Sequence, residues 1–156
     1  MKLNDVIEPS RVLTRCKLGS KKAVITKVSE TLGLALPDLD EDVIAEKFFN
    51  RERLGSTGVG YGVAIPHVRD ESLTQACACF LQLAAPVDYE APDNRPVDLI
   101  FALMVPAHNP SSHLQLLAEI AKRFSDPDFR EEARRLTDPD ALHEFMTQHA
   151  YQYACA

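Results

Sequence analysis

A nearly continuous apolar run stands past the middle of the chain and reads Val97-Asp-Leu-Ile-Phe-Ala-Leu-Met-Val105. The run is short and is followed by Pro106, which is typical of a β-strand. A strand that is apolar on both sides is buried on both faces, so helices should cover its sheet from both sides. The segment therefore predicts a sheet that lies between two layers of helices.

Shorter apolar runs and helical patterns surround this strand along the chain. Residues 63–65 and 77–83 are predicted as strands, because each is a short apolar run bounded by turn-forming residues. Ser20 and Asp40 precede stripes of helical spacing and are predicted N-caps, whereas Asp-Pro pairs begin two later helices. The predicted helices cover residues 21–34, 40–54, 113–125, 127–136 and 139–149. Helices, then strands, then helices indicate a three-layer domain of the α/β or α+β class.

Size and charge limit the functions that the chain can serve. Its 156 residues, of which 46% are hydrophobic, suit one globular domain. The net charge of −6 disfavours nucleic-acid binding, and no basic stripe offsets it. No apolar run approaches the roughly 20 residues that span a bilayer, so no membrane insertion is expected. Met1–Asp5 lacks the apolar segment of a secretory signal, so we expect a cytoplasmic protein.

The four cysteines are predicted to be structural. Cys77 and Cys79 stand two residues apart in a predicted strand, so they share one face and suit small buried hydrophobic positions. No nearby Cys or His completes a metal site, and no metal is expected. Cys16 and Cys155 are isolated in the sequence and are expected to be reduced thiols.

The chemical signal of the chain lies in residues 51–67, Arg51-Glu-Arg-Leu-Gly-Ser-Thr-Gly-Val-Gly-Tyr-Gly-Val-Ala-Ile-Pro-His67. Four of the six glycines of the chain fall here, which predicts a sharp turn or a close approach to the backbone. A neutral imidazole such as that of His67 can attack a phosphoryl group. An arginine, hydroxyl groups and backbone N–H groups can stabilise the charged oxygens in transit. Arg51 and the Ser56–Gly60 segment offer all three, so an anion site beside a nucleophile is predicted.

A second histidine is predicted close to this site. Ser112 and Gln115 have the spacing of a capping box, which places His113 in the first turn of a helix. The helix dipole at this end disfavours an imidazolium and favours a nearby anion. The helix follows the strand that ends at Val105, and ligands of open α/β sheets usually bind at that carboxyl edge. His113 is therefore a candidate second wall of the site.

Other interpretations of these residues stay open on spacing alone. A histidine after a strand is often only a hydrogen-bonded structural residue, and a glycine-rich turn by itself is a weak signal. Arg51 can equally belong to a solvated helix end. Nucleotide-binding folds fit poorly, because no lysine follows the glycines and the glycines precede a strand instead of opening a helix. The Gly-x-Ser-x-Gly pattern of hydrolases is absent as well.

The segment from Arg51 to His67 resembles the enzyme IIA domains of the bacterial phosphoenolpyruvate-dependent phosphotransferase system, of the mannitol/fructose type. In that family the histidine after Ala-Ile-Pro is phosphorylated, and this residue corresponds to His67. The second family histidine corresponds to His113, and the arginine beside the site corresponds to Arg51. Residues 18–22 and 91–106 resemble the nitrogen-related enzyme IIA, the regulatory branch of the same family.

The resemblance implies the architecture and the site of the chain. It implies a single enzyme IIA type-2 domain over residues 1–156, of the α/β class with a central mixed β-sheet flanked by helices on both faces. It implies catalytic roles for three residues and phosphate binding by four others, with no cofactor and no metal. The catalytic residues are His67, His113 and Arg51, and the phosphate-binding residues are Ser56, Thr57, Gly58 and Gly60.

The resemblance also implies the function, a regulatory phosphohistidine carrier that is a phosphotransferase component. A small histidine-phosphorylated phosphocarrier protein would donate the phosphoryl group to His67. The chain would then control regulatory targets, potassium transport or sensor proteins among them, by binding that depends on phosphorylation. Two alternatives stay open: a sugar-transport enzyme IIA that passes phosphate to a permease, and an interaction module that takes no phosphate.

One short segment departs from the family pattern. Relatives commonly have glycine and lysine after the active histidine, where this chain has Val68-Arg69-Asp70. Val68 restricts the backbone, and Asp70 is expected to place an acid near the phosphoryl site. We therefore expect this segment to affect the loop conformation and the choice of partner.

Overall fold

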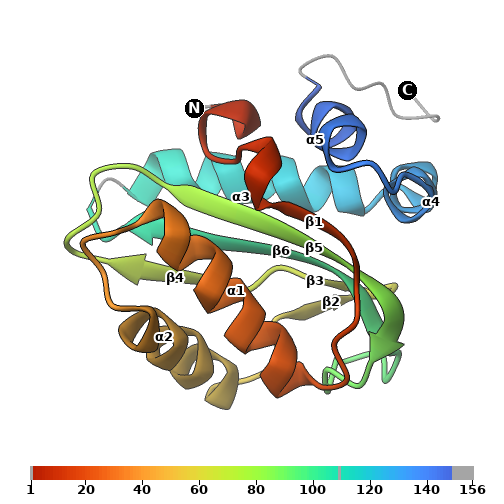
Figure 1. Ribbon diagram of the computed structural model, residues 1–156, viewed down its shortest axis with the longest axis horizontal. Helices are drawn as coiled ribbons and strands as arrows, with labels where there is room; N and C mark the ends of the chain where they lie inside the picture. The colour runs from red at the N-terminus through yellow and green to blue at the C-terminus, as the bar shows by residue number, and fades with distance from the viewer. Residues whose placement is uncertain (1, 109, 149–156) are drawn as a thin grey trace.

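The computed structural model of the chain describes residues 2–108 and 110–148, which form a six-stranded sheet with helices on both faces (Figure 1). The single-domain α/β fold with a mixed sheet is thereby confirmed. In chain order the elements are η1 (Leu3–Asp5), η2 (Pro9–Arg11), β1 (Val12–Cys16), α1 (Lys21–Ala35), α2 (Glu41–Arg53), β2 (Gly58–Gly60), β3 (Val63–Ala64), β4 (His67–Asp70), β5 (Cys77–Val87), β6 (Val97–Pro106), α3 (Pro110–Phe124), α4 (Pro127–Arg135) and α5 (Pro139–Thr147).

The strand β6 is the centre of the sheet. The hydrogen-bonded order is β1-β5-β6-β3-β2, and β4 also pairs with β6. β5 runs antiparallel to β6, whereas β3 and β4 run parallel to it. All residues of β6 except the half-buried Asp98 are buried, which confirms the prediction of a strand covered on both faces.

Two apolar cores lie on the two faces of the sheet, because successive side chains of a strand point to opposite sides. The first core is closed by α3, α4 and α5, and the second by α1 and α2 (Figure 1). The side chains that β6 sends to the first core are Leu99, Phe101, Leu103 and Val105, and those that it sends to the second are Val97, Ile100, Ala102 and Met104.

Capping side chains fix where four of the helices begin. Ser20 and Asp40 accept backbone N–H groups at the starts of α1 and α2, as predicted. Asp126 and Asp138 do the same for α4 and α5, each followed by a proline at the first helical position. α5 ends at Thr147 with Gln148 as its C-cap, two residues before the predicted end at residue 149, which itself lies outside the described residues. No helix within the described ranges has the length and apolar character that crossing a membrane requires.

The start of the remaining helix, α3, differs from the prediction. α3 begins at Pro110, three residues before the predicted start, so Ser112 is a residue within the helix and does not occupy the predicted N-cap position. Proline at a first helical position was the signal for this start. His113 is the fourth residue of α3 and therefore still lies at the end of its first turn.

Three strands are missing from the sequence-based assignment, namely β1, β2 and β4. β1 pairs in parallel with β5, which is distant along the chain, so no local turn announces it. β2 lies within the segment interpreted as a glycine loop and forms an antiparallel pair with β3. β4 contains His67, which the sequence places after a strand and which instead begins one.

The glycines of residues 58–62 allow β2 and β3 to turn tightly. Gly62 has a φ of 81°, and a Cβ at this position would approach the Nη2 atom of Arg134 to 2.5 Å. Arg134 is held there by an ion pair with Asp98 at 3.0 Å. At Gly58 the constraint is space, since a Cβ would lie 2.7 Å from the Cβ of Ala91. The glycine cluster therefore makes a hairpin that packs against β6 and α4.

The chain runs along β6 twice, first as β3 and then as β4. Val63 lies beside Leu99 in the first stretch, and His67 lies beside Leu103 in the second. Pro66 stands between them and has no N–H to donate, but its carbonyl accepts the N–H of Leu103 at 3.0 Å. The interruption at Pro66 therefore fixes where His67 begins the second stretch.

Candidate active site

The ring of His67 is half-buried and has a defined hydrogen bond. Its Nδ1 lies 3.0 Å from the carbonyl oxygen of Ile65. A carbonyl can only accept, so Nδ1 carries a hydrogen, and Nε2 of the neutral ring keeps its lone pair. The hydrogen bond thus leaves Nε2 as the ring nitrogen whose lone pair is available.

A cleft of about 460 Å³ opens at His67 and is lined by residues of α2, β4 and α3. It brings together the three predicted catalytic residues, which come from three different elements. The residues of the cleft that matter here are Asn50, Arg51 and Leu54 from α2, His67 and Arg69 from β4, and His113, Leu114 and Leu117 from α3. Among the described lining residues, the charged side chains are two arginines, so the cleft suits an anion.

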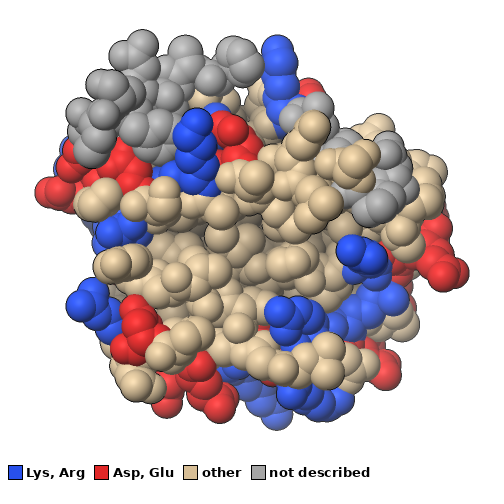
Figure 2. Space-filling model, turned by 180° about the vertical axis from the view of Figure 1, so that it is seen from behind, with Lys and Arg blue, Asp and Glu red and all other residues tan. Residues whose placement is uncertain are grey.

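The charge distribution over one face of the molecule is uneven. Seen from behind, the molecule is hollowed near its centre, and the surface of the hollow is largely uncharged (Figure 2). Lys and Arg side chains lie along one side of this hollow. Asp and Glu side chains border it elsewhere, so the uncharged floor of the hollow is surrounded by charges of both signs (Figure 2).

Arg51 stands in the last turn of α2, where its guanidinium is held in place. Its Nη1 donates to the carbonyl of Gly55 at 3.0 Å. A guanidinium has five N–H groups, so this bond fixes the head group without exhausting its donors. Arg51 can therefore offer a preformed fork to phosphoryl oxygens in the cleft.

His113 lies across the cleft from α2 and is buried. Burial lowers the pKa of its imidazole, and the nearby charges of Arg69 and His108 lower it further. An ordinary histidine has a pKa near 6.5, so this ring is neutral at pH 7. A neutral ring can donate one N–H group to a phosphoryl oxygen.

Arg69 was missed as a site residue by the sequence interpretation, although the signal was present. It stands two residues after His67 on β4, and side chains two apart in a strand share one face. Arg69 is exposed and lines the cleft with His67. It supplies a second guanidinium that could have been found once β4 was recognised as a strand.

Asp70 does not lie in the cleft, which corrects the expectation of an acid near the phosphoryl site. Its side chain is buried and points to the opposite face of β4 from His67, where Nζ of Lys47 is 3.5 Å from its carboxylate. Burial raises the pKa of Asp70, but hydrogen bonds from Ser72 and the charge of Lys47 outweigh this, and the net pKa is lowered. Asp70 is therefore a charged structural residue that joins β4 to α2.

The predicted phosphate-binding residues take other positions. Ser56 donates its hydroxyl to the carbonyl of Tyr89 at 2.9 Å and accepts the N–H of Gly58 at 3.1 Å. Thr57 is buried and donates its hydroxyl to the carboxylate of Glu52. The described lining of the His67 cleft includes neither these two residues nor Gly58 and Gly60. Phosphate binding by the backbone of this segment stays a prediction.

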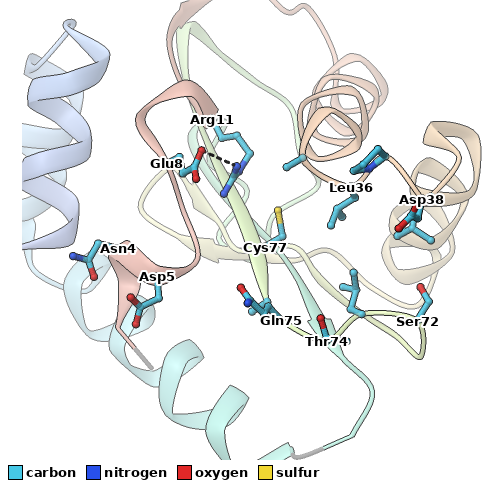
Figure 3. A pocket seen from close by; sticks show the side chains of 15 residues that line it. Asn4, Asp5, Glu8, Arg11, Leu36, Asp38, Ser72, Thr74, Gln75 and Cys77 are labelled. Carbon is cyan, nitrogen blue, oxygen red and sulfur yellow. Dashed lines mark ion pairs between the residues drawn. The ribbon is translucent and has the colours of Figure 1, made fainter.

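A second cavity, of about 590 Å³, lies between the N-terminal segment, the α1–α2 connection and the loop before β5 (Figure 3). Its charged residues are Asp5, Glu8, Arg11 and Asp38, and Arg11 forms an ion pair with Glu8 at 3.7 Å. Three carboxylates against one paired arginine make this cavity unsuited to a phosphoryl group.

The cysteines of the described chain behave as the sequence predicts. Cys77 lines the second cavity but is itself buried, and Cys79 is buried beside it on the same face of β5. Burial raises the pKa of both thiols, so they are protonated at neutral pH. The structural interpretation of this pair is confirmed, whereas Cys155 lies outside the described residues.

Comparison with known proteins shows similarity over almost the entire chain. The model of one family, "Phosphoenolpyruvate-dependent sugar phosphotransferase system, EIIA 2", matches residues 5–149. A nitrogen regulatory protein of Pseudomonas aeruginosa is 38% identical over 146 residues, which are 94% of this chain and 95% of the relative. A fructose-specific EIIA component of Haloferax volcanii is 32% identical over 109 residues, 70% of this chain and 71% of the relative.

The fold is shared with a solved structure of similar length. The crystal structure of the nitrogen regulatory protein IIA-Ntr from Neisseria meningitidis superimposes with a TM-score of 0.88 at 34% sequence identity. The match covers 93% of this chain and 99% of that protein. The three-layer arrangement that forms the His67 cleft is therefore common to both molecules.

Proposed function

We propose that this chain, which belongs to the EIIA 2 family of the phosphoenolpyruvate-dependent sugar phosphotransferase system, is a regulatory carrier of a phosphoryl group on His67. Family membership makes the chain a phosphoryl-transfer component. Its similarity to nitrogen regulatory proteins supports a regulatory phosphocarrier. The phosphoryl donor in the proposal is a small histidine-phosphorylated phosphocarrier protein, and the site of action is the cytoplasm.

The observation that carries the proposal is the hydrogen bond from Nδ1 of His67 to the carbonyl of Ile65. It leaves the Nε2 lone pair free to attack phosphorus. As the new P–N bond forms, the P–N bond to the donor histidine breaks, and that imidazole leaves with the electron pair. The phosphorylated ring gains positive character, which the carbonyl of Ile65 stabilises through Nδ1–H. No proton has to leave His67 during transfer.

The rest of the cleft stabilises the group in transit. The transition state of phosphoryl transfer is loose and carries its charge on equatorial oxygens, so positioned cations and N–H donors supply the catalysis. Arg51 and Arg69 provide guanidinium groups from two sides of the cleft, and neutral His113 provides an N–H donor. No metal or nucleotide takes part in the transfer step as proposed.

The rim of the cleft suits a protein partner. Leu54 at the end of α2 and Leu114 in α3 are 84% and 65% exposed, and both line the cleft. Exposed leucines beside a reactive centre offer apolar contact area to the phosphoryl donor and to regulatory targets, for which potassium transport or sensor proteins are candidates. A phosphate with close to two negative charges between these leucines would change which partners bind, which gives the regulatory switch a physical basis.

Two other functions are weighed against this one. The similarity to a fructose-specific EIIA component favours, as a second candidate, transfer of the phosphoryl group from His67 to a sugar permease. A module that only binds partners would use the same rim but would never become phosphorylated. Residues 1–156 act as a single enzyme IIA type-2 domain in each of these proposals.

Labelling with the phosphotransferase donors tests the proposal. The wild-type protein should gain one acid-labile phosphoryl group from the phosphorylated carrier protein, and His67→Ala should gain none while keeping the same circular dichroism. A wild-type protein that stays unlabelled by a donor that phosphorylates an authentic enzyme IIA would leave only the binding module. Onward transfer to a sugar permease domain in the same assay would favour the transport candidate.

A further inference from the structure

We propose that Glu52 is a positioning residue, which holds the turn after α2 and thereby keeps the guanidinium of Arg51 at the His67 cleft. The inference rests on the proposed phosphoryl transfer at His67, because it assigns Glu52 a task in that reaction. Glu52 is absent from the described lining of the cleft, so it acts through Arg51 and does not touch the phosphoryl group.

The carboxylate of Glu52 is buried, with 6% of its side chain exposed, and it has partners in three other parts of the chain. Its Oε2 lies 2.8 Å from Nζ of Lys21 in α1 and accepts the backbone N–H of Thr57 at 3.2 Å. Its Oε1 accepts the hydroxyl of Thr57 and that of Tyr89, the latter at 3.2 Å. A buried carboxylate is stable only when it is paired and hydrogen-bonded in this way.

The partners of Glu52 are themselves fixed. Nζ of Lys21 lies 4.7 Å from the ring centroid of Tyr89, and this ring belongs to a side chain that is fully buried. The hydroxyl of Ser56 donates to the backbone carbonyl of Tyr89 at 2.9 Å. Ser56 and Thr57 are thus both fastened to the segment after β5, and Glu52 is the charged centre of this arrangement.

The same turn carries the bond that orients Arg51. Arg51 and Glu52 are neighbours in the last turn of α2, so their side chains leave the helix about 100° apart, one towards the cleft and one inwards. The guanidinium of Arg51 donates to the carbonyl of Gly55, and the N–H of Gly55 donates to the carbonyl of Glu52 at 3.1 Å. Gly55 lies two residues before Thr57, whose anchoring to Glu52 therefore sets the position of the Gly55 carbonyl.

Neutralising Glu52 should loosen this turn without removing bulk. Glu52→Gln replaces one carboxylate oxygen by an NH₂ group, which cannot accept from Thr57 N–H and is not attracted to Lys21. The acceptor for the two hydroxyl groups can be kept. We expect the carbonyl of Gly55 to shift, and Arg51 to lose its fixed orientation while the fold persists.

A double-mutant cycle on phosphoryl transfer from the phosphorylated carrier protein tests the inference. Glu52→Gln should lower the maximal transfer rate about tenfold and change the carrier concentration at half-maximal rate by less than this, because Glu52 does not itself line the cleft, although Leu54 of the docking rim lies in the same turn. In an Arg51→Ala background the same substitution should change the rate by less than about twofold, since Arg51 is no longer there to misplace. Amide exchange of Gly55 and Thr57 should accelerate in Glu52→Gln.

The matched control is Glu90→Gln, because Glu90 is the other carboxylate near Lys21, at 4.0 Å, and its side chain is 79% exposed. This control should transfer at the wild-type rate.

Equal rates for Glu52→Gln and wild type, or the same tenfold loss with and without Arg51, would overturn the inference. If Glu52→Gln does not fold, Tyr89→Phe replaces it in the cycle with the same expected pattern and a smaller effect. A wild-type protein that takes no phosphate contradicts the proposed function, and the acceleration of exchange at Gly55 then still reports on the turn.

Discussion

The His67 cleft and the second cavity, which is the N-terminal cavity beside Asp5, Glu8 and Arg11, differ in chemistry more than in size. The N-terminal cavity is the larger, at about 590 Å³ against about 460 Å³, and it too contains an arginine. Its Arg11, however, donates to the carbonyl of Ala78 at 2.9 Å and to that of Val6 at 3.2 Å, besides its ion pair with Glu8. Arg11 is thus used to hold the chain together.

The His67 cleft leaves its cations available. Arg51 makes one hydrogen bond to a turn carbonyl, and Arg69 stands exposed beside His67. The neutral ring of His113 adds a donor without adding an acidic group, and Asp70, the acid of β4, is turned to the opposite face. Volume therefore does not distinguish the proposed phosphoryl site from the other cavity, whereas the sign and the availability of the charged groups do.

The largest effects are expected from two separate variants, in which either Arg51 or Arg11 is replaced by alanine. Arg51→Ala should slow phosphoryl transfer about 100-fold with little change in stability, because a positioned donor to the transition state is lost. Arg11→Ala should cost about 1–3 kcal/mol of unfolding free energy, because the carbonyl of Ala78 loses the Arg11 donor and that of Val6 keeps only the N–H of Ala78, with transfer by the folded protein unchanged. Rapid-quench kinetics and urea unfolding measure the two quantities, and an equal loss of rate in both variants would contradict the distinction.

Arg69→Gln should have a smaller effect on the rate, about tenfold, because Arg69 is exposed and water screens its charge. The same substitution should raise the pKa of His113, since the charge of Arg69 is one of the causes that lower it. A proton NMR titration of the His113 ring measures this shift. An unchanged pKa of His113 in this variant would contradict an electrostatic effect of Arg69 on the His113 ring.

His113 should also make stability depend on pH. Its pKa is lowered in the folded protein, so between that value and about 6.5 the unfolded chain takes up a proton that the folded chain does not. His113 therefore does not lower the free energy of unfolding above about pH 6.5. As the pH drops from there towards the folded pKa, that free energy falls by at most about 1.4 kcal/mol per pH unit. Urea unfolding from pH 7.5 to 5 should show a shallower loss for His113→Gln, and parallel curves for the two proteins would refute the assignment.

The smallest effect is expected in the N-terminal cavity. Asp38 is exposed and lines that cavity, and it is absent from the described lining of the His67 cleft. Asp38→Asn should therefore leave the rate of phosphoryl transfer within about twofold of the wild type, as expected for a surface substitution outside a reactive site. A large loss of rate in this variant would show that the two cavities are not independent.

Much of the fold could be predicted from local signals. Some signals are formed by residues that are adjacent in the sequence, such as the capping side chains Ser20 and Asp40 and the apolar run of β6. The helices and the buried strand can be predicted from these signals. β1 and β4 could not be found in this way, because each is short and pairs in parallel with a distant strand. β4 is also polar at His67, Arg69 and Asp70, so no apolar run announces it.

The candidate site follows the same division. His67, His113 and Arg51 were predicted, and the structure brings them into one cleft. Arg69 was missed because its facing depends on β4, which the sequence pattern did not reveal. The internal use of the Ser56 and Thr57 hydroxyls could not be foreseen either, because their partners Tyr89 and Glu52 meet them only after the sheet has formed.

The most direct test of a phosphoryl acceptor at Nε2 of His67 is nitrogen NMR of the phosphorylated protein labelled with ¹⁵N-histidine. The hydrogen bond from Nδ1 to the carbonyl of Ile65 predicts one phosphohistidine, with phosphorus on Nε2 of His67 and the proton retained on Nδ1. The spectrum of the His67→Ala variant, treated in the same way, should show no phosphohistidine signal. Phosphorus on Nδ1 of His67, or on any other histidine of the wild-type protein, would contradict the account.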